Sequence, residues 1–259
     1  MNDPLLQAYD DQLREGAEMG GAATVERLGP LWLAVFPGGR GFISYRSLPE
    51  DAQEIAELAD AALEHFRERT SATAVEWKTR AHDVAPGLEA VLTERGFVAE
   101  DPESIMIGRV EGLAADVELP HGVEVRRAET VDDVWAASEM QGLVFDDPHW
   151  RSRAEDAVRR LEERSVASLW IAVVDGVVVS AGRLVPVDGT DFAGIWGGAT
   201  LPEWRHHGIY RALTARRAEE ALRLGKTLIH SDSTEFSRPI LERSGLVAVS
   251  TTTPYVWTR

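Results

Sequence analysis

The chain has 259 residues, 44% of them hydrophobic, which is enough to build one large domain or two small ones. It contains no cysteine, so disulfides, thiolate metal sites and a cysteine nucleophile are excluded. The formal net charge of −16 argues against nucleic acid or an anionic membrane as a partner. It suits a cationic substrate such as an amine, or serves solubility alone.

The distribution of apolar and charged residues indicates where the protein works. No apolar run approaches the roughly 20 residues that cross a bilayer. Residues 1–4 lack the basic and apolar stretches that begin a secretory signal peptide. The acidity lies mostly in residues 1–115, which carry 10 Lys and Arg against 21 Asp and Glu. We therefore expect a cytoplasmic protein with no membrane or nucleic-acid partner.

Apolar periodicity and turn residues divide the first part of the chain into helices and strands. In order, the expected elements are a helix over 3–18, a hairpin over 24–46, a helix over 49–69, a strand over 73–78, a helix over 86–95 and a strand over 104–110. Residues 111–122 follow without periodicity and contain Gly and Pro, so we expect a domain boundary there.

The second part of the chain predicts an α+β pattern. In order, the expected elements are a strand over 123–126, helices over 131–144 and 152–164, strands over 169–174, 177–187 and 191–200, a helix that ends at Leu224, a strand over 227–230, a helix over 236–244 and two closing strands within 246–257. Short Asp-Gly turns between consecutive strands indicate a mostly antiparallel sheet.

The stretch from Gly197 to Leu213 is the most informative part of the sequence. An apolar strand contains Gly197 and Gly198, a pair that indicates a bulge or a close backbone approach, and it runs into a loop, then Gly208, then a long basic helix. Gly208 lets the backbone turn, and the first N–H groups of the helix lack partners and favour an anion. These features are typical of a phosphate-binding turn. The alternative is an ordinary strand–turn–helix corner.

The pattern Arg-x-x-Gly-x-x-Arg-Ala-Leu over 205–213 resembles the pyrophosphate loop of the GCN5-related N-acetyltransferases (GNAT), which bind coenzyme A. The order of elements after residue 122 is similar to that of the family, and the glycine turn falls where the family has it. The resemblance implies a GNAT-like acyl-CoA N-acyltransferase fold of the α+β class. Its mixed, mostly antiparallel sheet would be flanked by helices.

The first part of the chain is weakly similar to the second part in sequence and in the order of its elements. Leu92–Phe97 and Leu241–Leu246 both end a helix and enter a strand in similar sequence. We therefore expect two tandem copies of the fold: a degenerate GNAT-like domain over 1–112, without a cofactor loop, and a GNAT acetyltransferase domain over 123–259. The alternative for the first part is an unrelated α+β domain with a coincidental element order.

The resemblance implies acetyl-CoA as cosubstrate. Gly198 to Thr200 match the strand end that pairs with the pantetheine arm, and His206 to Arg211 match the segment that binds pyrophosphate through its amides. Tyr210 departs from the family pattern, which has a small residue there, so its side chain should point away from the phosphates. The residues expected to bind the cofactor are Gly198, Ala199, Thr200, Arg205, His206, His207, Gly208, Ile209, Tyr210, Arg211, Ser237 and Arg238.

The usual catalytic groups of the family cannot be carried over. Its acid, a cofactor-contacting Asn and a frequent base fall at Leu241, Thr234 and Ile229, and all three are replaced. The remaining catalytic candidates are Asp232, Ser237 and Tyr255, each of which could equally serve packing or the surface. Trp196 and the loop 145–150, with Asp146 and Asp147, could border the acceptor. No metal site is expected, because the adjacent His206 and His207 converge poorly on one ion.

Together these features predict an N-acetyltransferase that moves an acetyl group from acetyl-CoA to a primary amine of a small molecule by direct attack. The alternatives are a non-catalytic CoA-binding sensor or scaffold protein, which the missing acid and base favour, and a structural protein without a cofactor. A monomer or a homodimer is expected.

Overall fold

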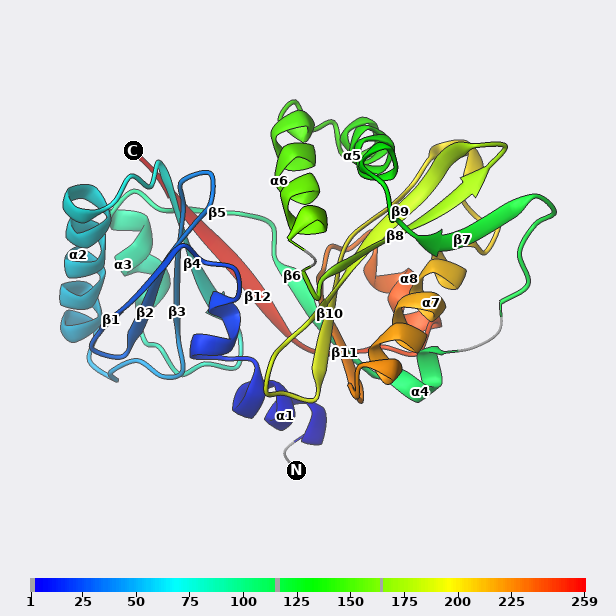
Figure 1. Cartoon of the computed structure of the whole chain (residues 1–259). Helices are drawn as coiled ribbons and strands as arrows, with labels where there is room; N and C mark the ends of the chain where they lie inside the picture. The colour runs from blue at the N-terminus through cyan, green and yellow to red at the C-terminus, as the bar shows by residue number, and fades with distance from the viewer. Residues whose placement is uncertain (1–2, 115–116, 164) are drawn as a thin grey trace. The chain divides into compact units, whose positions relative to one another are not determined.

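The structure, a computed structural model, describes residues 3–114, 117–163 and 165–259 and divides the chain into two compact units (Figure 1). The first unit contains the chain up to Met106 together with Asp232–Arg238 and Ala248–Arg259. The second contains Ile107–Ser231 and Pro239–Val247. The two units are therefore not the two continuous parts of the sequence, and the domain boundaries expected at residues 112 and 123 stay a prediction.

The sheet of the first unit has the order β1-β2-β3-β4-β12. Its strands are β1 (Thr24–Leu28), β2 (Leu31–Phe36), β3 (Arg40–Tyr45), β4 (Ala74–Arg80) and β12 (Val247–Thr258), and the short β5 (Val98–Ala99) pairs with β12. Only β3 and β4 run parallel; the other neighbours are antiparallel. The last strand of the chain thus completes the sheet of the first unit.

Helices α2 (Ala52–Arg69) and α3 (Leu88–Glu94) supply apolar side chains to the core of the first unit. In α2 the buried residues recur every three or four positions, and the Asp51 side chain accepts hydrogen bonds from the first free amides of the helix. The core gathers around Trp77 and Phe66, both fully buried. The chain then passes along β6 (Glu103–Arg109) and α4 (Val110–Leu113) into the second unit.

The sheet of the second unit has the order β11-β10-β9-β8-β7. Its strands are β7 (Val123–Arg127), β8 (Ser168–Val174), β9 (Val177–Pro186), β10 (Phe192–Thr200) and β11 (Leu228–Ser233). Its helices are α5 (Val131–Phe145), α6 (Trp150–Glu162), the 3-10 turn η2 (Pro202–Trp204), α7 (Ile209–Arg223) and α8 (Arg238–Arg243). Only β10 and β11 run parallel. This arrangement is the expected α+β class with a mixed, mostly antiparallel sheet, which is confirmed.

Helices α5 and α7 lie on opposite faces of the second sheet. Ile171 on β8 packs against Ala137 and Met140 of α5, whereas the adjacent Ala172 packs against Ile209 of α7. Neighbouring residues of a strand point to opposite faces, so the two helices cover the two sides. Among the described residues, no helix has the length and apolar character to cross a membrane.

Several expected boundaries were wrong. The helix expected over 3–18 is broken into α1 (Pro4–Gln12) and the 3-10 turn η1 (Glu15–Met19), because Glu15 takes a left-handed conformation with φ +59°. The region expected as a hairpin has a third strand, β1, and the two closing strands are the single strand β12. Arg164, where a helix was expected to end, and residues 115–116 of the expected boundary lie outside the described residues.

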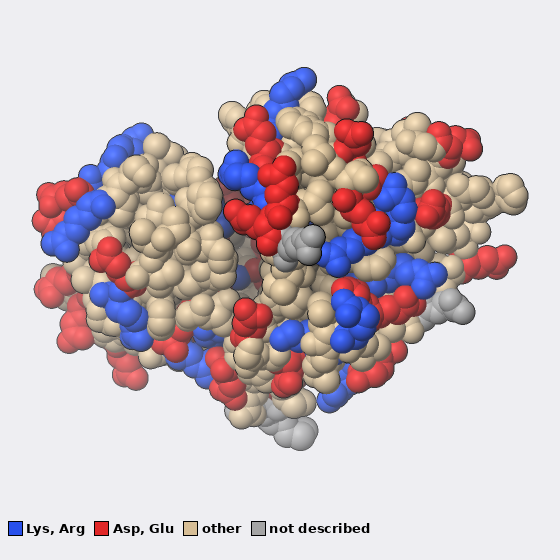
Figure 2. Space-filling view, viewed as in Figure 1, with Lys and Arg blue, Asp and Glu red and all other residues tan. Residues whose placement is uncertain are grey.

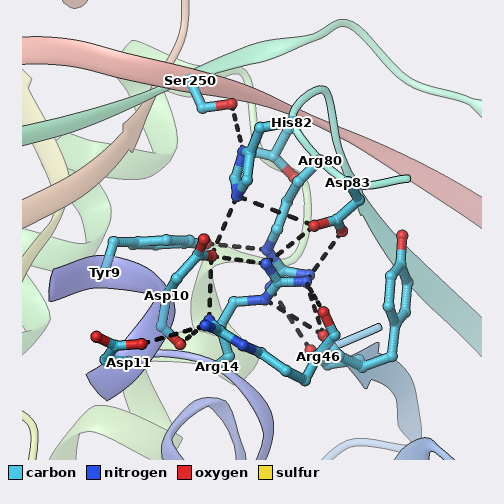
Figure 3. Close-up of polar contacts among 12 residues, drawn as sticks. Tyr9, Asp10, Asp11, Arg14, Arg46, Arg80, His82, Asp83 and Ser250 are labelled. Atoms are coloured by element: carbon cyan, nitrogen blue, oxygen red, sulfur yellow. Dashed lines mark hydrogen bonds and ion pairs between the residues drawn. The ribbon is translucent and has the colours of Figure 1, made fainter. Parts of the chain in front are cut away.

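Buried charges hold the N-terminal segment on the sheet of the first unit (Figure 3). The Arg14 guanidinium donates to the Asp10 and Asp83 carboxylates at 2.8 and 2.9 Å and to the Tyr45 carbonyl at 2.8 Å. The His82 ring lies within hydrogen-bond distance of Asp10, at 3.1 Å. Since the Arg14 side chain is only 2% exposed, these partners replace the water it loses on folding.

A second part of this buried cluster is centred on Arg80 of β4, whose side chain is fully buried. Its guanidinium donates to the Glu18 carboxylate and, at 3.1 Å, to the Tyr9 hydroxyl. Lys78 lies 3.4 Å from Glu18 and donates to Asp232 at 2.6 Å. Burial by itself raises the pKa of Glu18, but the charges of Arg80 and Lys78 outweigh burial and hold the pKa below its usual range.

Candidate functional site

A bulge interrupts strand β10 where the sequence has its glycine pair. Trp196 pairs with Arg183 of β9 and Ala199 pairs with Ala181, so Gly197 and Gly198 together face a single residue of β9. Gly197 has φ +60°, a conformation that glycine adopts without strain. A bulge leaves its extra residue out of the ladder of backbone hydrogen bonds, so it frees a polar backbone group at this point.

Beyond the start of β10, the pairing between β10 and β11 stops. The parallel register covers only three pairs and ends at Gly194 and His230. One position later the Ser231 hydroxyl donates to the Ile195 carbonyl at 2.9 Å, so a side chain takes the place of the backbone ladder. Within the described strands, the parallel register therefore does not extend to the last residues of β10, as expected if the two strands separate to admit an extended ligand.

A glycine turn connects β10 to the N-terminus of α7. Gly208 caps the helix with φ +79°, and the Ala212 amide donates to the Gly208 carbonyl at 2.9 Å. The amides of the first helical turn precede this bond and have no acceptor four residues back. Residues 205–208 are exposed, while the buried Ile209 fixes the start of the helix to the sheet. The exposed amides and the helix dipole favour an anion here.

One hydrogen bond and one uncommon backbone conformation characterise this turn. The Arg205 side chain donates through Nε to the Thr200 carbonyl at 3.1 Å, which ties the loop to the end of β10. His206 has φ +66°, an uncommon conformation for a residue with a side chain. Such local strain is retained when the surroundings require it, and it clusters at ligand sites.

The structure explains why Tyr210 stands where the family pattern has a small residue. Its ring lies against the bulge: a Cβ atom on Gly198 would come within 2.6 Å of the Tyr210 hydroxyl. The absence of a side chain at Gly198 therefore makes room for the tyrosine. The ring is turned towards β10 and is only half-buried there.

We expect Gly198→Ala to lower the free energy of unfolding by about 1–3 kcal/mol, because the added methyl overlaps the Tyr210 ring. The double variant Gly198→Ala/Tyr210→Ala should lose less than the sum of the two single variants, since removal of the ring also removes the overlap. Urea unfolding of the four proteins measures this coupling. Additive losses would show that the contact between Gly198 and Tyr210 is absent.

Comparison with known proteins identifies the second unit. Residues 113–230 match the family model described as acetyltransferase (GNAT) domain. This segment is a GNAT acetyltransferase domain. It contains the bulge, the strand separation and the glycine turn, and so the resemblance noted from residues 205–213 is confirmed. No curated protein matches the sequence.

The likeness to solved structures extends over nearly the whole chain. A GCN5-related N-acetyltransferase from Kribbella flavida is 17% identical and has a TM-score of 0.67, with 97% of this chain and 91% of that chain covered. A tandem GNAT protein from the clavulanic acid biosynthesis pathway is 16% identical, with a TM-score of 0.64 and coverage of 99% and 95%. A GCN5-related N-acetyltransferase from Sphaerobacter thermophilus is 16% identical, with a TM-score of 0.62 and coverage of 88% of this chain and 76% of that chain. The chain thus has the fold of two GNAT copies in tandem.

Sequence reasoning missed His230 of the GNAT domain. Its ring packs edge-to-face against Trp196, with centroids 5.3 Å apart, and against Phe192 at 5.8 Å. His230 lies where the pairing of β10 and β11 ends, on the same face of the sheet as these two aromatic rings. The sequence does not give the register in which β10 and β11 pair. It therefore could not show that His230 lies where this pairing ends.

The polar groups beside the bulge come from other elements of the same unit. Gln141 of α5 donates to the Gly197 carbonyl at 2.5 Å, and the Arg183 guanidinium lies 3.9 Å from where a Cβ atom of Gly197 would be. The loop 145–150 contains the end of α5 and the start of α6, with Asp146 in a left-handed conformation as the helix cap. On the face seen in Figure 2, acidic and basic side chains are interspersed.

The remaining candidate residues belong to the first unit by their contacts. Asp232 accepts a hydrogen bond from Lys78, and the Ser237 hydroxyl lies 2.7 Å from that of Ser233. Arg238 is exposed at the start of α8, and Tyr255 is buried on β12, where burial raises the pKa of its phenol. The structure brings Gly198–Arg211 together in the second unit. The cofactor-binding roles expected for Gly198–Arg211 and the roles expected for the other four residues all stay predictions.

Proposed function

We propose that the protein transfers an acetyl group from acetyl-CoA to a primary amine of a small molecule by direct attack. The carrying observation is that strand β10 joins three features in series: the bulge at Gly197 and Gly198, the separation from β11, and the turn at Gly208. In this proposal an extended thioester with an anionic end lies along these features, with its anionic end at the turn. We further propose that the protein acts in the cytoplasm as a monomer or a homodimer.

The residues present are compatible with a CoA-type ligand. A Cβ atom on Gly208 would be in ordinary van der Waals contact with the Glu118 carbonyl at 3.8 Å and with the Val117 side chain at 3.9 Å, and residues 205–211 contain no acidic side chain. In this proposal the amides of His206 to Arg211 hold the pyrophosphate, and the backbone of Gly198 to Thr200 pairs with the pantetheine arm. Acetyl-CoA supplies an activated acyl group as a thioester.

The bulge supports acyl transfer as well as binding. When an amine attacks a thioester, the carbonyl oxygen gains negative charge before the C–S bond breaks. A backbone N–H freed by a bulge can donate to that oxygen, and such preorganised donors contribute strongly to catalysis. The new C–N bond forms, the thiolate leaves, and the proton lost by the nitrogen restores the thiol.

A non-catalytic CoA-binding sensor or scaffold is the second candidate. The observation that favours it is Leu241, which stands where the family has its acid and is 1% exposed. Leucine cannot donate a proton to the leaving thiolate. An enzyme would therefore need an acid from an element other than α8, whereas a sensor would need none. Both functions require the same cofactor site, so binding and turnover separate them.

Two measurements on the intact protein test the proposal. Acetyl-CoA at a hundred times its dissociation constant should stabilise the folded protein by about 2.7 kcal/mol, seen as a raised melting temperature. Release of free thiol from acetyl-CoA should then depend on an added amine drawn from a panel. Absence of a thermal shift at millimolar cofactor would rule out both the enzyme and the sensor. A shift without thiol release from any amine would favour the sensor.

A further inference from the structure

Arg217 of α7 is a fully buried cation behind the proposed acetyl-transfer site. The residue is 1% exposed. Its guanidinium donates to the Leu213 carbonyl at 3.2 Å, to the Thr214 hydroxyl at 3.1 Å and to the Arg183 carbonyl at 3.4 Å. These acceptors are neutral groups. No carboxylate in the described part of the chain forms an ion pair with Arg217.

A buried charge without a counter-ion is unfavourable for folding. Burial lowers the pKa of Arg217, which is the direction expected for a cation that has lost its water. Arginine nevertheless stays protonated in proteins, so the charge persists. A methionine of similar volume would fill the same space without this penalty, since buried ionic groups are often replaced by apolar ones with no loss of stability. Packing alone therefore does not account for an arginine here.

The guanidinium of Arg217 lies against the residue of β9 that is opposite the bulge. A Cβ atom on Gly182 would come within 2.7 Å of Arg217 Nη1, and Gly182 is the residue of β9 that faces Gly197 and Gly198. The guanidinium carbon also lies 5.8 Å from the centre of the Tyr210 ring, which itself packs on Gly198. Gly182 thus lets the arginine lie against β9 opposite the bulge, and Gly198 lets the tyrosine lie against the bulge itself.

We propose that Arg217 is a positioning residue that stabilises, through the backbone of the bulge in β10, the negative charge that develops on the thioester during acetyl transfer. Tyr210 holds the guanidinium in place by its ring and keeps water from this side of the bulge. The proposal rests on the function proposed above. In addition to the amides that would bind the cofactor, it gives α7 a second role, which is to supply the buried positive charge of Arg217. In a medium of low polarity such a charge acts over several ångströms.

Arg217→Met tests this role because it keeps the volume and removes the charge. We expect kcat to fall roughly tenfold, less than the loss of a direct oxyanion donor, because Arg217 acts through the backbone. The KM for acetyl-CoA should stay within about twofold, because the phosphate turn is intact. The melting temperature of the variant without ligand should be equal to or higher than that of the wild type. Arg217→Lys, which restores the charge, should recover part of kcat.

If Arg217 had only a structural role, its loss would lower the melting temperature. A lower kcat with an unchanged or higher melting temperature therefore supports the positioning role. Arg217→Gln is a second neutral variant that keeps hydrogen-bond donors, and it should show the same loss of kcat. Arg216→Met, on the exposed face of the same helix, is the matched control and should leave kcat unchanged. The inference would be overturned if the wild type is active and Arg217→Met is equally active. It would also be overturned if the melting temperature of Arg217→Met falls together with its kcat. A wild type without transfer to any amine would instead contradict the proposed function.

Discussion

Gly208→Glu is expected to abolish the stabilisation of the protein by acetyl-CoA. Gly208 caps α7 with φ +79°, and in the proposed function the amides of His206 to Arg211 hold the pyrophosphate. A glutamate there strains the backbone and places a carboxylate against the phosphates. Both effects act on the same contact, so a stabilisation of about 2.7 kcal/mol at a hundredfold excess over the dissociation constant should vanish entirely.

Thermal melting with and without acetyl-CoA measures this effect. The control is Gly225→Glu at the opposite end of α7, where the glycine has φ +76° and nothing within 4 Å of an added Cβ. It introduces a similar backbone strain and the same charge far from the turn. It should lower the melting temperature and keep the shift with acetyl-CoA. A normal shift in Gly208→Glu would place the pyrophosphate elsewhere.

Arg80→Met is expected to lower the free energy of unfolding by about 3–5 kcal/mol, the usual loss when one partner of a buried ion pair is removed. The Arg80 side chain is 0% exposed and that of Glu18 only 10%, so the remaining carboxylate cannot be compensated by water. Lys78, 3.4 Å from Glu18, replaces only part of the lost interaction. The effect should appear in the first unit, where all three residues lie.

Chemical unfolding followed by circular dichroism checks this prediction. The double variant Glu18→Gln/Arg80→Met should lose less than the sum of the single variants, because the two side chains contact each other. Arg216→Ala, which breaks the exposed pair with Glu219, should be indistinguishable from the wild type. If Arg80→Met were as stable as this control, the buried cluster would contribute nothing to the fold.

The buried cluster also shows what sequence reasoning could not reach. Arg80, Glu18 and Asp232 look like ordinary charged residues in the sequence, because their partners are far away along the chain. Arg80 and Glu18 are 62 positions apart, and Lys78 and Asp232 are 154 positions apart. Asp232 was one of the catalytic candidates from the sequence. In the structure it accepts a hydrogen bond from Lys78 of β4, a contact that only the folding of the first unit creates.

The sequence by itself determined the features that depend on neighbouring residues. The turn at Gly208, the bulge at Gly197 and Gly198, and the alternation of helices and strands in residues 123–259 follow from local conformational preferences and periodicity. These features sufficed to indicate the α+β class and the GNAT resemblance, both of which are confirmed. The expected helix boundaries were wrong where the conformation of one residue changed the path of the chain, as the positive φ of Glu15 does within the helix expected over 3–18.

Only the tertiary structure decided which distant segments meet. It placed β12 beside β4 in the first unit, turned Tyr210 onto Gly198, and buried Arg217 behind the bulge. The physical reason is that strand partners and the contacts of buried side chains depend on the packing of whole elements. Periodicity within one element gives the face that is buried, and it does not give the neighbour against which that face is buried.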